Sequence, residues 1–347
     1  MKLGIIGLLQ SGRTTIFSAL TGARGQNNDS SSSRSDSRLT TIRVLDNRVV
    51  FLSELYCPKK TTYAQVEYLI PSSPHSSGSE LNSSTWNQLR TCDALLHVVR
   101  NFTHLGGTAP SPDQDFQQIE DEMILSDLAV AEKRIERIQL DRKRGKTKED
   151  EELPLLRKCQ GFLEKGEALR RQKELSARPE LKGFTFLSAK PQLVIINNGD
   201  DDEAMPVWRK APDNVELLAV RGKLEMDIAD MEADEAEEFK EAYNIHESVL
   251  DRVIETSYKM LNRLSFFTVG PDEVKAWPVE TGTPARKAAG TIHSDIEKGF
   301  IRAEVLSFKN LKIHGSFQNA KKLGLVRLEG KDYEVKDGDI INFRFNV

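Results

Sequence analysis

The sequence predicts an α/β domain that carries a helical insertion and is followed by a small α+β domain. Three observations lead to this prediction. Short apolar segments alternate with helical patterns in the first half, as in a mostly parallel sheet covered by helices. Residues 113 to 178 are rich in Glu, Lys, Arg and Leu at helical spacing. From Leu264 onward, alternating β-branched and aromatic segments are separated by Gly and Asp turns.

Length and composition agree with two soluble globular domains. The 347 residues are 38% hydrophobic, 29% charged and 7% aromatic. No segment reaches the roughly 20 apolar residues of a membrane span, and the apolar opening Leu3 to Leu9 lacks a basic lead-in and is interrupted at once by polar residues. The three cysteines are odd in number and match no metal spacing, as expected in a reducing compartment. We therefore expect a cytoplasmic protein without a membrane partner.

The first domain begins with a buried strand, a glycine-containing loop and a helix. Residues 1 to 9 are mostly apolar, and Ile16 and Leu20 continue in helical spacing. Two polar stretches, residues 22–38 and 71–79, have no apolar side chains to bury and are expected to be loops. The further expected strands are 64–70, 94–99, 184–187 and 193–196.

The insertion is predicted to be two helices packed as an antiparallel coiled-coil hairpin. Its first apolar stripe is Ile124, Leu128, Ala131, Ile135 and Ile138, and its second is Leu155, Leu156, Cys159, Phe162 and Leu163. The hairpin is either an arm that binds a partner or a self-packing element with solvated charges.

The charge balance restricts any contact with nucleic acid. The chain has 49 Lys and Arg against 53 Asp and Glu, a net charge of −4, which excludes a wholly basic nucleic-acid coat. Residues 263–347 alone have 14 Lys and Arg against 11 Asp and Glu, or +3. An RNA contact is therefore expected to be local and to favour the last domain, and no reading of DNA sequence is expected.

Residues 7 to 14 have the spacing of the phosphate-binding loop G-x-x-x-x-G-K-[ST] between a strand and a helix. Arg13 stands where that motif has lysine. Backbone N–H groups and a helix N-terminus hold phosphate without this lysine, but a planar guanidinium is a poor substitute for it. The loop therefore either binds phosphate or is a vestigial turn between the strand and the helix. The expected phosphate-binding residues are Gly7, Gln10, Ser11, Gly12, Arg13, Thr14 and Thr15, and the Thr14 hydroxyl is the expected Mg²⁺ ligand.

Several longer segments resemble the Obg-like ATPase (YchF) family of translation-factor P-loop NTPases over nearly the whole chain. They are residues 1–15, 56–60, 92–100, 188–191, 266–274 and 293–305. The resemblance implies a P-loop G-domain at 1–112 and 179–262 with the coiled-coil insertion at 113–178. It also implies a C-terminal TGS domain with a ubiquitin-like β-grasp fold at 263–347.

The sequence departs from this family at the positions that sense the γ-phosphate. Where the family has D-x-x-G after a strand, this chain has Ile70-Pro71-Ser72-Ser73. The first switch, with its metal-coordinating threonine, falls in the serine-rich residues 27–38, where we find no counterpart. The family's catalytic histidine is expected after Arg100, and His104 lies too early in its loop for a firm assignment. Because phosphoryl transfer depends on such groups, hydrolysis is expected to be weak or absent.

The expected base-binding residues follow the strand at 193–196. Asn197, Asn198 and Asp200 occupy the position of the GTPase motif N-K-x-D, and Gly222 lies in the second base-side loop. The family usually has Glu at the fourth position and prefers ATP, so Asp200 leaves ATP and GTP both open. The Asn198-Gly199 pair is alternatively only a tight turn. His97, in an apolar strand, is expected to be a core histidine with its polar atoms satisfied.

The sequence therefore predicts a cytoplasmic Obg-like protein that binds ATP or GTP, with Mg²⁺ as cofactor if nucleotide binding is retained. The resemblance alone implies association with the ribosome or RNA. The alternative is a scaffold whose coiled coil and TGS domain bind a partner while the phosphate loop is vestigial. A third hypothesis is a slow NTPase that uses unorthodox residues.

Overall fold

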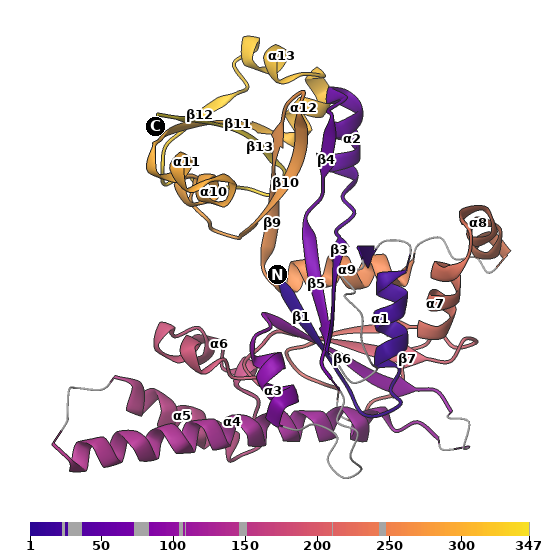
Figure 1. Cartoon of the computed structure of the whole chain (residues 1–347), viewed down its shortest axis with the longest axis vertical. Helices are drawn as coiled ribbons and strands as arrows, with labels where there is room; N and C mark the ends of the chain where they lie inside the picture. Colours follow the sequence, from indigo (N-terminus) through magenta and orange to yellow (C-terminus); the bar gives the residue numbers. More distant parts are fainter. Residues whose placement is uncertain are drawn as a thin grey trace. The chain divides into compact units, whose positions relative to one another are not determined.

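The computed structural model describes residues 1–22, 25–26, 37–72, 83–103, 107, 109–145, 151–209, 211–242 and 248–346 (Figure 1). The chain divides into two compact units. The first consists of Met1–Ile42 and Glu67–Val253, and the second of Arg43–Val66 and Ile254–Val347. The predicted His104 and residues 27–36 of the predicted first switch lie outside the described residues.

The first unit is built on a seven-stranded sheet of order β2-β3-β5-β1-β6-β7-β8. The five strands from β5 to β8 run parallel, and β2 and β3 pair antiparallel. The strands are β1 (Lys2–Ile6), β2 (Gly25–Gln26), β3 (Arg38–Arg43), β5 (Gln65–Ile70), β6 (Ala94–Asn101), β7 (Gln192–Asn198) and β8 (Glu216–Val220). Every residue of β7 is buried, as expected for a strand covered on both faces. The predicted α/β fold with a mostly parallel sheet is confirmed.

Helices cover this sheet through apolar side chains. Trp86 and Leu89 of α3 (Ser83–Arg90) and Met123 of α4 (Pro112–Lys143) share one core cluster with Ile6 and Leu95 of the sheet. Helix α1 (Arg13–Thr21) packs against α7 (Gly222–Asp230). Two further helices follow, α8 (Ala233–Ala242) and α9 (Val249–Met260). The second part of α9, from Ile254, belongs to the other unit.

The predicted hairpin is present as α4 and α5 (Glu152–Leu163), which lie side by side (Figure 1). Ala131, Ile135 and Ile138 of α4 share a buried cluster with Leu156 and Cys159 of α5. Three short helices follow, η1 (Leu169–Arg171), α6 (Lys173–Ser176) and η2 (Pro179–Phe184). The strand expected at 184–187 is wrong: these residues end η2 and continue without a strand, and the buried Phe186 packs in the hairpin core. The apolar stripes predicted from the sequence therefore form the core of the hairpin.

The second unit has a six-stranded sheet of order β12-β11-β13-β9-β10-β4. Its strands are β4 (Lys60–Thr62), β9 (Arg263–Val269), β10 (Glu273–Glu280), β11 (Phe300–Ser307), β12 (Arg327–Glu329) and β13 (Asp339–Phe345). The helices are α2 (Asn47–Tyr56), α10 (Ala285–Ile292), α11 (Ser294–Lys298), α12 (Phe308–His314) and α13 (Phe317–Lys322). Alanines of α10 pack with Phe266 and Phe343 of the sheet, as expected for a β-grasp arrangement of strands and helix.

Residues 43–66 belong to this second unit, whereas the boundaries drawn from the sequence placed them with residues 1–112. Strand β4 extends the sheet by pairing in parallel with β10, with Thr61 opposite Val274. The ring of Phe51 in α2 meets that of Phe308 edge to face at 5.5 Å between centroids. The pairing of β4 with β10 joins residues more than 200 positions apart. Such a pairing leaves no local pattern in the sequence from which it could be predicted.

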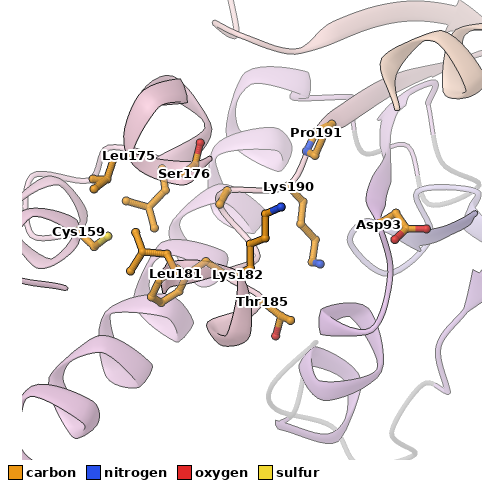
Figure 2. A pocket seen from close by; sticks show the side chains of 12 residues that line it. Asp93, Cys159, Leu175, Ser176, Leu181, Lys182, Thr185, Lys190 and Pro191 are labelled. Atoms are coloured by element: carbon orange, nitrogen blue, oxygen red, sulfur yellow. The ribbon is translucent and has the colours of Figure 1, made fainter. Parts of the chain in front are cut away.

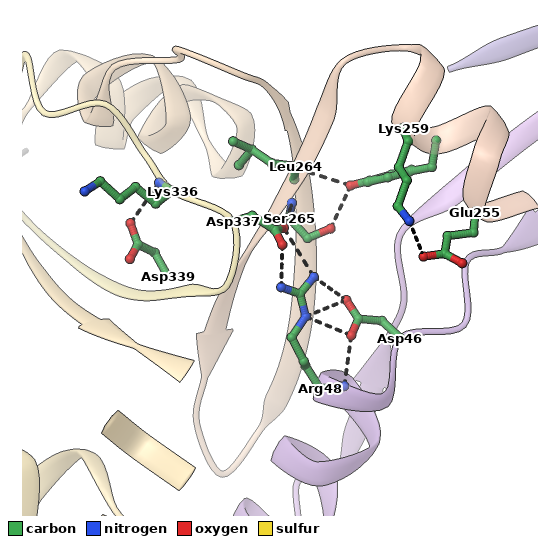
Figure 3. Close-up of polar contacts among 10 residues, drawn as sticks. Asp46, Arg48, Glu255, Lys259, Leu264, Ser265, Lys336, Asp337 and Asp339 are labelled. Atoms are coloured by element: carbon green, nitrogen blue, oxygen red, sulfur yellow. Dashed lines mark hydrogen bonds and ion pairs between the residues drawn. The ribbon is translucent and has the colours of Figure 1, made fainter. Parts of the chain in front are cut away.

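A polar network fastens this segment to the rest of the second unit (Figure 3). Asp46 caps α2 by accepting from the N–H of Arg48 at 2.9 Å, and the Arg48 guanidinium bonds both Asp46 and Asp337. Asp337 also accepts from the N–H of Ser265 in β9 at 3.0 Å. Burial would lower the pKa of Arg48, but the hydrogen bonds that its guanidinium donates to the two carboxylates raise that pKa overall, so the guanidinium stays charged. Two carboxylates thus hold one cation beside the start of β9.

Within the described residues, no helix combines the length and apolar character needed to cross a membrane.

Candidate functional site

The predicted phosphate loop joins β1 to α1 and needs glycine at its two ends. Gly7 and Gly12 have φ angles of 151° and 93°, in the region that favours glycine. A Cβ on Gly7 would collide with the carbonyl of Val98 and lie 2.7 Å from Ser11 Oγ. A Cβ on Gly12 would overlap the side-chain amide of Asn197. The spacing of the two glycines is therefore required by the way this loop closes against β6 and β7.

The first turn of α1 is open to an anion. Gly12 is the N-cap and provides no side-chain cap, and no acidic residue lies in the first turn. The N–H groups of that turn have no intrahelical partner, and the helix dipole favours negative charge there. Thr14 is exposed, while Arg13 and Thr15 are half-buried. Backbone and dipole together give the loop the properties of a phosphate site without any contribution from a lysine.

The remaining predicted loop residues have different environments. Gln10 is exposed and adopts a left-handed φ of 63°. Ser11 is 2% exposed, and its hydroxyl has no hydrogen-bond partner among the described residues. Its N–H donates to the carbonyl of Leu8 at 3.2 Å, which closes the turn. The loop is thus held in shape by its own backbone at Ser11.

Asn197 ties the phosphate loop to the second base-side loop. Its amide donates to the carbonyl of Ser11 at 3.0 Å, and its carbonyl accepts from the N–H of Gly222 at 3.0 Å. The residue is 3% exposed. A Cβ on Gly222 would lie 2.6 Å from the Asn197 oxygen and 2.7 Å from Ile16, so this position also requires glycine. The structure therefore brings Ser11, Gly12, Asn197 and Gly222 together.

Asn198 makes its contacts elsewhere. Its carbonyl accepts from the Asn101 amide at 2.8 Å, and its own amide donates to the carbonyl of Ala204 at 2.8 Å. Neighbouring residues of a strand point to opposite faces, so the Asn198 side chain leaves β7 on the side away from Asn197. The structure thus places Asn198 apart from the other predicted base-contact residues, in a role that shapes the turn after β7.

Asp200 lies in that turn and is exposed. The N–H of Asp202 donates to the carbonyl of Gly199 at 3.2 Å, which closes the turn. Arg221, just before Gly222, forms an ion pair with Glu203 at 2.9 Å. This pair links the loop after β7 to the loop before α7. Sequence reasoning missed Glu203, because no motif marks a residue whose partner comes from another loop.

The strand end expected to carry the metal-shell aspartate has no carboxylate. Ile70 is 8% exposed at the end of β5, and the Ser72 hydroxyl accepts from the Gln88 amide at 3.2 Å. Across the described parts of the chain, no group of three or more His, Cys, Asp or Glu side chains is arranged to hold a metal. A Mg²⁺ ion at the phosphate loop would be held by the Thr14 hydroxyl and by phosphate oxygens. Both are hard oxygen ligands, which Mg²⁺ prefers.

A second polar cluster lies on the hairpin side of the sheet. His97 of β6 is 1% exposed, stacks on Phe116 at 5.2 Å and bonds the Gln192 amide through Nδ1 at 2.9 Å. Burial and the nearby charge of Arg170 lower the pKa of His97 to about 3, so it is neutral. Its Nε2 has no hydrogen-bond partner among the described residues. The expected core histidine is confirmed, but only one of its two nitrogens is satisfied.

The base of the hairpin is anchored by Asp127 of α4. Its carboxylate accepts from the N–H groups of Leu187 and Ser188 at 3.0 and 2.7 Å and pairs with Arg90 at 2.8 Å. Burial raises the pKa of Asp127, while the charge of Arg90 opposes that shift. The segment from Ser188 to Pro191 is thereby fixed to the insertion.

A cavity of about 260 Å³ lies beside this segment (Figure 2), and no residue of the phosphate loop lines it. Its walls are mostly apolar, with Lys182, Lys190 and Asp93 at its edge. The Lys190 ammonium already donates to the carbonyls of Arg90 and Cys92, and burial lowers its pKa. The cavity therefore lacks the convergent polar groups that the phosphate loop provides.

Known proteins are similar to this chain over its whole length. The family model YchF-GTPase_C, described as "Protein of unknown function (DUF933)", matches residues 264–346. The "Ribosome-binding ATPase YchF" of Bacillus subtilis is 36% identical over an alignment of 370 residues that covers 100% of both chains. The protein of the same name from Escherichia coli O157:H7 is 35% identical and covers 100% of this chain and 99% of its own.

Two solved structures have a similar fold. The YchF GTPase of Schizosaccharomyces pombe superposes with a TM-score of 0.82 at 25% identity, over 99% of this chain and 97% of that one. A GTP-binding protein from Pyrococcus horikoshii OT3 gives a TM-score of 0.59 at 16% identity, with both chains fully covered, and shares the fold.

Proposed function

This chain belongs to the YchF family, and on that premise we propose that it binds ATP or GTP at residues 7–15 and acts at the ribosome as a nucleotide-responsive factor. The relatives named above are called ribosome-binding ATPases. We further propose that its own hydrolysis is weak or absent.

The observation that carries the proposal is the Asn197 contact. One buried amide holds the carbonyl of Ser11 in the phosphate loop and the N–H of Gly222 in the base-side loop. Both hydrogen bonds lie in the interior, where an unpaired backbone group costs about 1–3 kcal/mol. Gly7, Gly12 and Gly222 each face a neighbour that excludes a side chain, so the loop keeps the backbone conformation in which its N–H groups can hold phosphate.

The residues proposed to contact the nucleotide divide into two groups. Gly7, Gln10, Ser11, Gly12, Arg13, Thr14 and Thr15 are proposed to surround the phosphates, with Thr14 also holding Mg²⁺. When bound, Mg²⁺ withdraws charge from the β- and γ-phosphate oxygens. Asn197 and Gly222 are proposed to frame the base, and Asp200 to approach it from the exposed turn after β7.

Weak hydrolysis is proposed because the groups that act on the γ-phosphate are replaced. Arg13 stands for the loop lysine, and Ile70-Pro71-Ser72 stands for the start of D-x-x-G. Each such group contributes to the charge stabilisation on which phosphoryl transfer depends, so their joint replacement is expected to lower turnover by orders of magnitude. Binding relies mainly on backbone N–H groups and is expected to survive.

Titration of the full chain with fluorescent ATP and GTP analogues, with and without Mg²⁺, tests the binding proposal. We expect saturable binding that unlabelled nucleotide displaces, and at least tenfold weaker binding in Asn197→Ala. Circular dichroism of the variant serves as the control for folding. Absence of binding in the native chain, together with binding in Arg13→Lys, would support the scaffold alternative instead.

Single-turnover phosphate release tests the hydrolysis proposal. We expect release close to the rate without protein in the native chain and a measurable gain in Arg13→Lys. Mg²⁺-dependent turnover in the native chain that is lost in Thr14→Ala would instead support a slow NTPase. Co-sedimentation with ribosomes in ATP, GTP or no nucleotide tests the ribosome proposal, and we expect the bound fraction to change with nucleotide.

A further inference from the structure

The second unit contains a basic segment without acidic residues. Residues 305–328 include five Lys and Arg and not a single Asp or Glu. This segment forms the end of β11, helices α12 and α13, and the start of β12. In Figure 1 the two helices follow one another at one end of the second unit, and they contact each other. The excess positive charge of residues 263–347 is therefore concentrated in one place.

Three lysines of this segment carry charge that no described carboxylate neutralises. Lys309 and Lys312 of α12 and Lys322 of α13 are exposed. Among the residues that the structure describes, none of the three forms an ion pair, and Lys312 lies 5.7 Å from the Phe51 ring, which does not neutralise it. We call Lys309, Lys312 and Lys322 the basic face.

Several exposed lysines of the same unit, by contrast, are neutralised by carboxylates. Lys59 pairs with Asp272 at 2.8 Å, Lys60 with Glu273 at 3.5 Å, and Lys287 with Glu297 at 2.8 Å. Even Lys321, next to Lys322, pairs with the buried Glu304 at 2.7 Å. Glu304 also bonds Arg344 and is therefore fully engaged. The basic face is left with uncompensated charge, which favours an anionic partner.

Its other side chains suit RNA better than a membrane. Ile313 and Leu323 are 65% and 61% exposed, and the amides Gln318 and Asn319 are exposed between them. Ile313 in the seven-residue α12 and Leu323 directly after the six-residue α13 do not make the long apolar face of a membrane-surface helix. Lysines and amides without neighbouring carboxylates are the groups that contact phosphate and ribose in RNA complexes.

We propose that the basic face binds the phosphate backbone of RNA. This inference rests on the proposed ribosome association and names the part of the chain that makes the contact. Each lysine that neutralises a phosphate releases a counterion, so binding weakens with salt, with a slope of about 0.7–0.9 per contact on a logarithmic plot.

The test compares two triple variants of the full chain. Lys309→Gln, Lys312→Gln and Lys322→Gln remove the basic face. Lys59→Gln, Lys60→Gln and Lys287→Gln remove the same total charge from exposed lysines that are paired with carboxylates. The probes are purified ribosomes, protein-free ribosomal RNA, and vesicles containing phosphatidylserine, each titrated between about 50 and 200 mM KCl.

We expect the basic-face variant to bind ribosomes and free RNA at least tenfold more weakly, with its salt slope reduced by about two to three, and the control variant to resemble the native chain. Equal binding by both variants would overturn this inference and leave the proposed ribosome association intact. Binding to vesicles but not to RNA would overturn it in favour of a lipid surface. A native chain that does not sediment with ribosomes would refute the ribosome proposal itself.

Discussion

At the scale of single residues, the candidate site depends on contacts that leave no room for change. Asn197 serves two loops at once, and Gly12 and Gly222 lie so close to it that neither position has space for a side chain. Arg13 is the exception, because it replaces the loop lysine without altering these backbone contacts. The loop thus has the backbone geometry that the proposed binding requires, and the charged side chain at position 13 is the part that differs from the motif.

Gly12→Ala is expected to abolish nucleotide binding. The substitution adds a Cβ at a left-handed φ and pushes aside the Asn197 amide, which displaces the loop. Gly166→Ala is the matched control, because Gly166 has a similar positive φ of 72° but open space around it. Both variants are expected to lose about 1–2 kcal/mol of stability from backbone strain alone, with a further loss in Gly12→Ala. Equal nucleotide affinity in the two variants would contradict the role given to the loop.

His97 is expected to make stability depend on pH. The pKa of His97 is about 3 in the folded chain against an ordinary value of 6.5, so the unfolded chain binds more protons between these limits. The stability that the neutral His97 contributes is fully present above about pH 6.5. It is lost as the pH falls below that value, at up to about 1.4 kcal/mol per pH unit. Arg170 and its partner Glu120 face this region and keep their ion pair in His97→Gln, whereas Gln192 loses its hydrogen bond to Nδ1 of His97.

Urea unfolding of the native chain and of His97→Gln at pH 7 and pH 5 measures this effect. We subtract the free energy of unfolding of His97→Gln from that of the native chain. This difference is expected to be about 2 kcal/mol smaller at pH 5 than at pH 7. A difference between the two proteins that does not change with pH would rule out the buried neutral histidine.

At the scale of elements, the sequence predicted what each segment becomes better than where it packs. The apolar stripes of α4 and α5 and the buried run of β7 are local patterns, and each indicated the correct element. The segment 43–66 shows the limit. No helix or strand is predicted there before residue 64, and only the pairing of Thr61 with Val274 and the contacts of Arg48 assign the segment to the second unit. Such pairings depend on residues far apart in the chain.

Arg48→Ala is expected to destabilise the second unit by about 1–3 kcal/mol, because Asp46 and Asp337 lose their shared cation (Figure 3). Arg48→Lys is expected to restore only part of this loss, since an ammonium cannot bond both carboxylates as a planar fork does. Lys259→Ala, which removes an exposed pair with Glu255, is the control and is expected to cost less than about 0.5 kcal/mol.

Fluorescence of Trp277, in a background with Trp86→Phe and Trp208→Phe, reports unfolding of the second unit alone. If Arg48→Ala and Lys259→Ala shift the urea midpoint equally, the network does not hold residues 43–66 in this unit.

At the scale of the whole molecule, the chain has the fold of its family, and it has Arg13 and Ile70-Pro71-Ser72-Ser73 at the positions where the resemblance implies groups that act on the γ-phosphate. The resemblance in sequence was sufficient to indicate the α/β fold, the hairpin and the β-grasp unit. It also placed Asn197 and Gly222 near the phosphate loop. It did not indicate that the Asn198 side chain is committed to Asn101 and Ala204, because a motif aligns positions and does not record to which side of a strand each residue points.

Residues 7–15 are proposed to be a working nucleotide site. Amide hydrogen exchange of the full chain, with and without saturating ADP or a non-hydrolysable ATP analogue and Mg²⁺, tests this proposal most directly. We predict slower exchange in peptides that contain residues 7–15 and residues 221–223, where backbone N–H groups and the Asn197 contact lie, and no change in peptides from α12 and α13. Unchanged exchange at residues 7–15, with slower exchange elsewhere or nowhere, would contradict the account.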